Sequence, residues 1–463
     1  MKKLIIKISQ LLLVLSITAL PLIATAQEDR EWYGRPSHWR PYDKRGVNMF
    51  ETGKQDDSMA FDGLRVRIGA GFTQQFQNLK QKNIGSSNYE TSNRLYPISS
   101  GFMTAQANLF VDVQLADGIR LNVSTYLSTR HHNEAWVKGG YIQFDKLPFK
   151  GQFWKDLMEV TTIKVGHMEI NYGDAHFRRS DGGNALYNPF VENNLMDAFT
   201  TEIGGELYWQ KSGFLAMMGI TDGEIQGSVT KRNARKPSFY GKVGYDKTFG
   251  ERKRVRVTGS IYTTKSSISN TLYGGDRAGS RYYFVMEGPA ATLTGNSFSG
   301  RINPGFKDNI TAFMINPFIK FKGIEVFGTY EIAQGNSQIE NGELQSTDPL
   351  QPALVKLGKR QFNQYAVDAL YRFANEKMYV GAKYNVVDGA LAFGQVTTQP
   401  NINQGIYDNV TVERTAFAAG WFITRNILMK AEYVTQKYQD FPSTDIRSNG
   451  KFQGWVVEGI IGF

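Results

Sequence analysis

The chain has 463 residues and no cysteine, so neither disulfides nor thiolate metal sites can stabilise it. It has only five histidines, and none of them falls in a metalloprotease or phosphate-loop pattern. After residue 26 it also lacks an apolar run of about 18 residues, which excludes a helical membrane protein. Stability must therefore come from backbone hydrogen bonding and packing.

The N-terminal segment has the pattern of a secretory signal. Three lysines precede an apolar stretch at residues 11–23 that is too short to cross a bilayer as a helix, and small residues follow at 24–26. We predict a signal peptide at residues 1–26, which makes the chain an exported one. Cleavage of the signal peptide would remove these three lysines and lower the net charge from +10 to +7. That mild excess of cations favours anionic partners, and no nucleic acid is expected as a partner of an exported chain.

Strict alternation of apolar and polar residues is the main signal for the fold. In residues 103–115, apolar side chains from Met103 to Leu115 point one way and polar ones, including Asp112, point the other. Residues 116–118 form a tight turn, and alternation resumes at Ile119. The pattern recurs near 64–72, 255–261, 324–332, 365–373, 378–384 and 427–433. Glycine (47), tyrosine (23) and phenylalanine (30) are plentiful, as expected of a barrel with one apolar and one polar face.

Connection lengths set the number of strands. Short connections at 210–213, 374–377 and 424–426 alternate with long ones near 79–100, 169–200, 221–236, 264–308, 334–360, 388–408 and 438–450. The last strand ends at Phe463, a terminal aromatic that resembles the insertion signal of outer-membrane barrels. Residues Tyr282–Met286 look like a strand, but a strand there would make the number of strands odd, so we assign them to a loop. The prediction is an all-β, transmembrane antiparallel β-barrel of sixteen strands, or alternatively eighteen, with long external loops and short periplasmic turns.

Two segments resemble a known family. Residues 163–173, IKVGHMEINYG, resemble the pattern that follows the fifth strand in the porin O and P family, whose best-known members are phosphate-selective porins. Residues 426–433, NILMKAEY, and the terminal strand are similar to the closing strands of that family, and the motifs suit its Bacteroidetes-type porins. The resemblance implies a sixteen-stranded porin that forms a homotrimer. Phosphate selectivity does not carry over, because the family's lysine and arginine cluster has no residue-by-residue match here.

The loop after the fifth strand is the candidate constriction. A wide barrel needs a loop that folds inward if it is to discriminate between solutes, and residues 169–200 form a long loop rich in charged side chains. Opposed charges across a narrow pore would orient permeating solutes. The alternative is an external loop with solvated charges. The candidate residues of the loop are Asp174, His176, Arg178, Arg179, Asp181 and Glu192.

Cations on the strands are a second set of pore-lining candidates. Alternation turns Arg120, Arg372 and Arg414 inward, and Lys164 lies on the strand before the loop. Inward carboxylates offset these cations, so most of the charges are expected to pair across neighbouring strands rather than to form a binding ladder. A mild anion preference is the resulting prediction.

Residues 27–60 show no clean alternation and are predicted to be a periplasmic extension, either disordered or tucked into the lumen as a partial plug. The barrel then occupies residues 61–463. No catalytic, metal or cofactor site is predicted, although His131 and His132 could bind a metal weakly in a loop.

The predicted function is a non-enzymatic porin in the outer membrane of a Gram-negative bacterium. It would allow passive diffusion of small hydrophilic solutes or anions, with outer-membrane lipid and lipopolysaccharide around it. The alternative is a pore-blocked barrel that serves as a structural or partner-binding component of a surface or secretion complex.

Overall fold

The computed structural model describes residues 39–54, 61–87, 93–128, 130, 135–181, 184–225, 236–250, 252–265, 270–337, 359–391 and 409–463. The predicted signal peptide and most of the predicted 27–60 extension lie outside these residues. The chain divides into Met1–Arg35 and Pro36–Phe463, and the account below concerns the second part.

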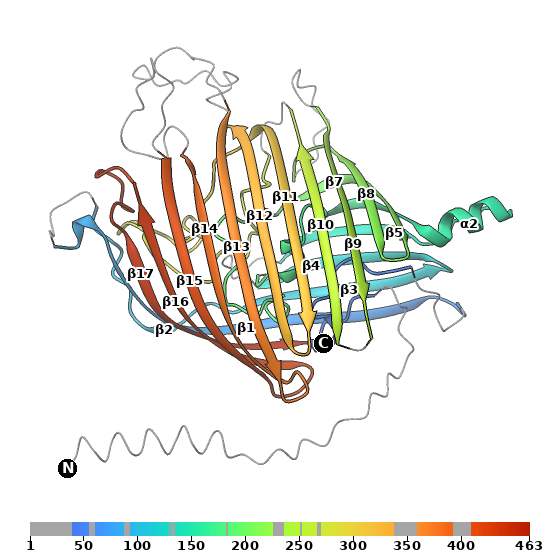
Figure 1. Cartoon of the computed structure of the whole chain (residues 1–463), viewed down its shortest axis with the longest axis horizontal. Helices are drawn as coiled ribbons and strands as arrows, with labels where there is room; N and C mark the ends of the chain where they lie inside the picture. The colour runs from blue at the N-terminus through green and yellow to red at the C-terminus, as the bar shows by residue number, and fades with distance from the viewer. Residues whose placement is uncertain are drawn as a thin grey trace. The chain divides into compact units, whose positions relative to one another are not determined.

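Strands dominate the described chain and close into one ring (Figure 1). From β3 to β17 each strand pairs antiparallel with the next, β1 pairs with both β3 and β17 and closes the ring, and the two-residue β2 is an extra strand beside β1. The strands are β1 (Arg65–Lys82), β2 (Gly101–Phe102), β3 (Gln106–Ala116), β4 (Ile119–Ser128), β5 (Trp136–Phe144), β6 (Thr161–Glu169), β7 (Thr201–Lys211), β8 (Phe214–Thr221), β9 (Ser238–Thr248), β10 (Lys253–Thr263), β11 (Asp308–Phe321), β12 (Ile324–Asn336), β13 (Arg360–Phe373), β14 (Met378–Ala390), β15 (Asn409–Phe422), β16 (Ile427–Gln439) and β17 (Lys451–Gly462).

The prediction of a sixteen-stranded antiparallel barrel is confirmed, and the alternative of eighteen strands is not needed. The ring contains β1 and β3 to β17, while Tyr282–Met286 forms turns rather than a strand. Long and short connections alternate as the sequence predicts, apart from the long connection between β5 and β6. Because the short turns of such barrels face the periplasm, we refer to the end that carries residue 463 and those turns as the periplasmic end.

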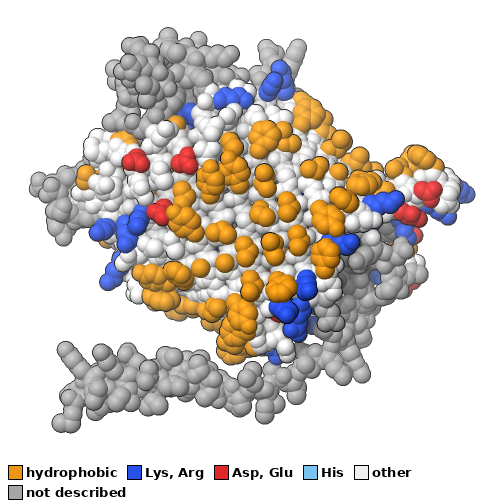
Figure 2. Space-filling view, in the orientation of Figure 1, with side chains coloured by type: hydrophobic (Ala, Val, Ile, Leu, Met, Phe, Trp, Pro, Cys, Tyr) orange, Lys and Arg blue, Asp and Glu red, His pale blue; other side chains and the backbone are white. Residues whose placement is uncertain are grey.

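The outer face of the barrel is apolar. Many of the side chains predicted to point outward are exposed, for example Val66 at 56%, Val257 at 46% and Tyr371 at 51%. Hydrophobic side chains are spread over the strands in Figure 2. Exposed aromatic rings lie near the strand ends, among them Trp209 and Phe463. A closed antiparallel barrel with such a surface is a transmembrane barrel, since every strand is paired and lipid can cover the outside.

The inner face is lined by charged residues that pair across strands. Several oppositely charged residues stand directly opposite each other in register and form ion pairs, so alternation places the charges and strand pairing neutralises them. The pairs that meet both conditions are Arg67 with Asp112, Lys164 with Glu206, Arg256 with Asp246, Lys320 with Glu325, Lys383 with Asp368, and Lys430 with Glu458.

Two long loops lie inside the barrel. Loop L3 (170–200, between β6 and β7) reaches the opposite wall, where the N–H groups of Leu195 and Met196 donate to Asn385 of β14 and Gln364 of β13. Loop L5 (264–307, between β10 and β11) contacts β17 through an ion pair of 2.9 Å between Arg281 and Glu458. The described parts of both loops are largely buried, so they reduce the open cross-section of the lumen.

A segment before the first strand also lies against the inner wall. Within this lumen segment (39–54), Tyr42 donates to Asp112 of β3 at 3.1 Å and Arg254 of β10 donates to the carbonyl of Asn48 at 2.9 Å. Glycine makes room for it on the wall, because a Cβ at Gly69 would lie 2.0 Å from the Tyr42 ring. Residues 39–54 are thus fixed by specific contacts.

One connection at the periplasmic end departs from the predicted short turns. Residues 145–160 link β5 to β6 and contain a helix, α2 (Gln152–Val160), which projects from the barrel in Figure 1. No helix in the described ranges is both long and apolar enough to cross a membrane.

Candidate functional site

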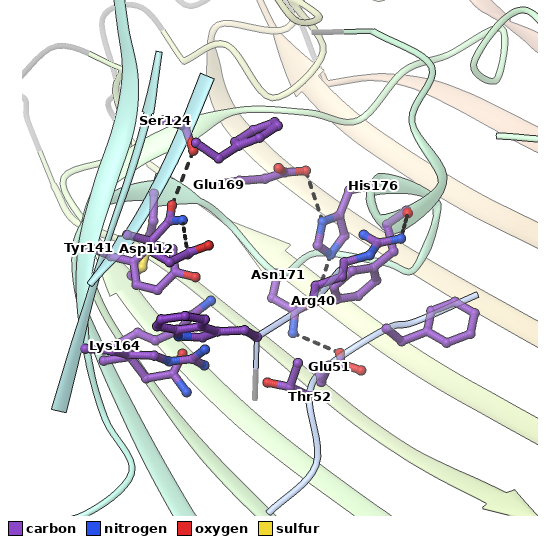
Figure 3. Close-up of a pocket in the computed structure, with 18 of the residues that line it drawn as sticks. Arg40, Glu51, Thr52, Asp112, Ser124, Tyr141, Lys164, Glu169, Asn171 and His176 are labelled. Atoms are coloured by element: carbon purple, nitrogen blue, oxygen red, sulfur yellow. Dashed lines mark hydrogen bonds and ion pairs between the residues drawn. The ribbon is translucent and has the colours of Figure 1, made fainter. Parts of the chain in front are cut away.

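The candidate site is a chamber of about 260 Å³ inside the barrel. Its lining comes from the lumen segment, the first half of L3 and the wall strands β1 and β3 to β7. A space of this size holds many waters, since one water needs only about 10–15 Å³ measured in this way. Figure 3 shows the polar side chains that converge on it.

The strand wall of the chamber carries cations. The Lys164 ammonium lies 3.6 Å from Glu206, and its side chain stays 21% exposed inside the barrel. Arg120 lies nearby on β4, 3.7 Å from Asp145. Arg67 of β1 pairs with Asp112 and is 23% exposed. Water in the lumen therefore reaches cationic side chains on this wall.

The opposite side of the chamber is a chain of hydrogen bonds. The His176 ring lies between Glu169, at 3.0 Å from Nδ1, and Asn171, at 2.9 Å from Nε2 (Figure 3). Asn171 also donates to Glu51 of the lumen segment at 2.9 Å. The Glu169 side chain remains 32% exposed. Acidic and amide groups thus face the cationic wall across the chamber.

Glu51 fixes the lumen segment to the wall. It accepts from Arg256 at 2.6 Å and from Lys242 at 3.0 Å, and the same two cations hold Asp174 at the start of L3. Burial raises the pKa of the Glu51 carboxyl, but Lys242 and Arg256 outweigh burial and hold that pKa well below its usual range. The Glu51 carboxylate is therefore ionised at neutral pH, and the cluster links the lumen segment, L3 and the wall.

A second cluster ties L3 to L5. Arg179 pairs with Asp181 and Asp197 of its own loop, and Arg301 of L5 donates to Asp197 at 2.6 Å and to Glu192 at 2.6 Å. All five side chains are buried. Buried charges of this kind are tolerated only when they are paired, so the two loops stabilise each other.

Acid is expected to loosen this cluster. Burial raises the pKa of Asp181, but Arg179 and Arg301 outweigh burial and hold it at about 2. This folded-state pKa lies below the pKa of about 3.9 that an aspartate has in the unfolded chain. The stabilisation from Asp181 is therefore fully present above about pH 4 and is lost as the pH falls towards 2. The expected loss in the free energy of unfolding from this group is about 2 kcal/mol. The free energy of unfolding measured at pH 7, 4 and 2.5 checks this. Asp181→Asn should show a weaker fall over that interval, and a fall as steep as that of the unmodified chain would contradict the assignment.

The ten residues predicted to line the constriction fall into two groups. Four of them line the chamber: Arg120, Lys164, His176 and Arg179. The other six are engaged elsewhere: Asp174 with Arg256, Arg178 with Asp368 at 3.7 Å, Asp181 with Arg179, Glu192 with Arg301, Arg372 with Glu325 at 2.9 Å, and Arg414 with Gln436 and the carbonyls of Asn193 and Gly300.

Sequence reasoning missed several lining residues. Arg40 and Glu51 enter from the lumen segment, which carries no strand pattern to place it, and Tyr141 lies on β5, where Gly139 and Gly140 obscure the alternation. A surplus of charged and aromatic residues before the first strand was the one available signal. The described residues contain no cluster of three His, Cys, Asp or Glu side chains able to hold a metal ion. His131 and His132 lie outside the described part of the chain.

The fold defines the class of the protein. A closed, even-stranded antiparallel barrel with an apolar exterior and a polar interior is the architecture of bacterial outer-membrane proteins, and on that ground we assign the chain to the outer membrane as a multi-pass β-barrel.

Comparison with known proteins gives matches to solved structures. No protein-family model matches the chain, and no curated protein sequence matches it. An anion-selective porin from Comamonas acidovorans is similar, with 10% identity and a TM-score of 0.48, over 86% of this chain and 100% of that one. OmpT of Vibrio cholerae has 11% identity and a TM-score of 0.47, over 88% and 99%. The channel DcaP of Acinetobacter baumannii has 10% identity and a TM-score of 0.46, over 87% and 99%.

Proposed function

We propose that the protein is an outer-membrane porin that allows passive diffusion of small hydrophilic solutes. The observation that carries the proposal is the water-accessible polar chamber inside a closed sixteen-stranded barrel. L3, with the lumen segment, acts as the constriction, and Arg120, Lys164, His176 and Arg179 select among solutes.

A mild preference for anions follows from the charges around the chamber. Its lining carries five permanent cations, Arg40, Arg67, Arg120, Lys164 and Arg179, against the three carboxylates Glu51, Asp112 and Glu169. Partners outside the lining, such as Glu206 beside Lys164, reduce the field of these cations, so the preference is weak. Reversal potentials in planar bilayers under a KCl gradient test it, and a clear preference for potassium would overturn it.

Reversing the charge of Lys164 is expected to shift that preference. Lys164→Glu places a carboxylate beside Glu206 on the wall, and a change of about 1 kcal/mol in the barrier alters the chloride-to-potassium permeability ratio roughly fivefold. The measurement is the reversal potential of the variant. The control is Lys146→Glu, which makes the same charge change at an exposed turn residue that pairs with Asp117. If both variants shift the reversal potential equally, Lys164 does not face the permeating ions.

We also propose membership of the porin O and P family in its Bacteroidetes type, with three copies per assembly. The strand motifs at 163–173 and 426–433 support this proposal. Electron microscopy of the detergent-extracted protein tests the assembly. Three pores per particle are expected, and single barrels would contradict the trimer.

A second candidate function is a pore-blocked barrel that binds a partner of a surface or secretion complex. The lumen segment and the two inward loops favour it, because buried ion pairs fix all three to the wall: Arg256 with Glu51, Arg256 with Asp174, and Arg281 with Glu458. Such a barrel would insert into a bilayer without conducting, which separates the two functions.

A further inference from the structure

Helix α2 has one apolar side. Phe153, Trp154, Leu157 and Met158 follow the i, i+1, i+4, i+5 spacing, which gathers them on one side of a helix, and the remaining positions before Val160 are polar or charged. Figure 2 shows the hydrophobic side chains on one side of the projecting helix and the charged ones on the other. The barrel covers only part of this apolar side.

Most of that apolar surface has no protein cover. Met158 is 5% exposed and packs towards the barrel, whereas Phe153 is 67% exposed and Leu157 is 38% exposed. Phe149, in the linker before the helix, is 55% exposed, with its ring 5.0 Å from that of Trp154. An exposed apolar cluster rimmed by polar residues marks an interaction surface.

The apolar side of α2 continues the membrane-facing surface of the barrel. The helix ends at Val160, and Thr161 begins β6 directly opposite Trp209 of β7. Trp209 is 41% exposed, and Phe214, which follows the next turn, is 56% exposed on the same surface. Helix α2 therefore leaves the barrel at the periplasmic edge of the barrel's apolar belt.

Local hydrogen bonds stabilise the helix and its junction with β6. The Thr161 hydroxyl donates to the carbonyl of Leu157 at 2.7 Å and its backbone N–H caps the same carbonyl, while Gln152 donates to Asp156 at 2.6 Å. Two exposed lysines, Lys150 and Lys155, can reach lipid phosphates while their stems follow the apolar surface.

We propose that α2 is an interfacial helix that docks on the phospholipids of the periplasmic leaflet and fixes the depth of this side of the barrel in the membrane. Continuity with the lipid-facing belt favours phospholipid over a second copy of the chain. A stable interface between copies buries about 800 Å² on each, which is more than a nine-residue helix with two exposed apolar side chains offers alone.

Depth-dependent fluorescence quenching tests this directly, because the chain has no cysteine and accepts a single label. Phe153→Cys and Glu159→Cys are labelled with bimane in vesicles of phosphatidylethanolamine and phosphatidylglycerol. Lipids carrying a shallow nitroxide are expected to quench the label at 153 several-fold more than the label at 159, and aqueous iodide is expected to show the reverse order. Leu157→Cys repeats the test should the first variant assemble poorly.

Two outcomes would overturn the proposal. Equal iodide quenching at both positions would place α2 in water. Protection of position 153 from both quenchers, together with disulfide-linked pairs of Phe153→Cys chains, would identify a second copy as the occupant. Neither result depends on whether the barrel conducts.

Discussion

Replacing Arg256 by alanine is expected to raise the single-channel conductance and to lower the free energy of unfolding by about 3–5 kcal/mol. Arg256 donates to Glu51 of the lumen segment, to Asp174 of L3 and to Asp246 of β9. Its loss leaves Lys242 as the one remaining cation that pairs with Glu51 and Asp174 among the described residues. Buried carboxylates that lose a partner are strongly destabilising, so the segment and the start of L3 should leave the wall and widen the path.

Arg254→Ala is the matched control for this variant. Arg254 lies on the same strand and pairs with the same Asp246, but its side chain is 24% exposed. It contacts the lumen segment at the Asn48 carbonyl and the Phe50 ring, which carry no charge, and does not contact Glu51 or Asp174. A loss within about 1 kcal/mol is expected there, with the conductance nearly unchanged. Equal conductance and stability in the two variants would show that the Glu51 and Asp174 cluster does not hold the lumen contents in place.

Replacing Arg301 by alanine is expected to separate L5 from L3 and to make the channel current noisy. The guanidinium joins Glu192 and Asp197. Its removal leaves Glu192 buried with only neutral hydrogen-bond donors among the residues that the structure describes, at a cost of about 3 kcal/mol. Recordings at constant voltage measure the current fluctuations, and denaturant unfolding measures the stability.

The double variant Arg301→Ala with Glu192→Gln separates loss of the ion pair from loss of packing. Removing the unpaired charge should restore part of the lost stability, as a positive coupling in a double-mutant cycle. Arg447→Ala is the outside control, because its ion pair with Asp445 lies within the loop between β16 and β17. Fully additive single and double variants would contradict a direct role for the Arg301 and Glu192 pair.

The sequence predicted the wall of the barrel better than its contents. Alternation at 103–115 anticipates β3, with Asp112 inward and Leu115 outward, because each side chain of a strand faces either lipid or lumen. The same rule anticipates that inward cations pair across neighbouring strands, as Lys430 does with Glu458. These contacts are set by strand register.

The contents of the lumen depend on contacts between residues far apart in the sequence. Arg301 and Glu192 are 109 residues apart, and Glu51 meets Arg256 across 205 residues. No local period in the lumen segment or in L5 signals such partners, so the sequence predicted L5 only as a long connection. Helix α2 is different, because the spacing of Phe153, Trp154, Leu157 and Met158 carried a helical signal inside a region of strands.

Single-channel recording in planar bilayers tests the central claim, that the lumen of this barrel is a path for small solutes. The purified protein in KCl is expected to give stable, ohmic current steps of uniform size, which rise in Arg256→Ala and keep their size in Arg254→Ala. Folded protein that inserts into the bilayer and gives no current steps would contradict the claim and would favour the pore-blocked, partner-binding barrel.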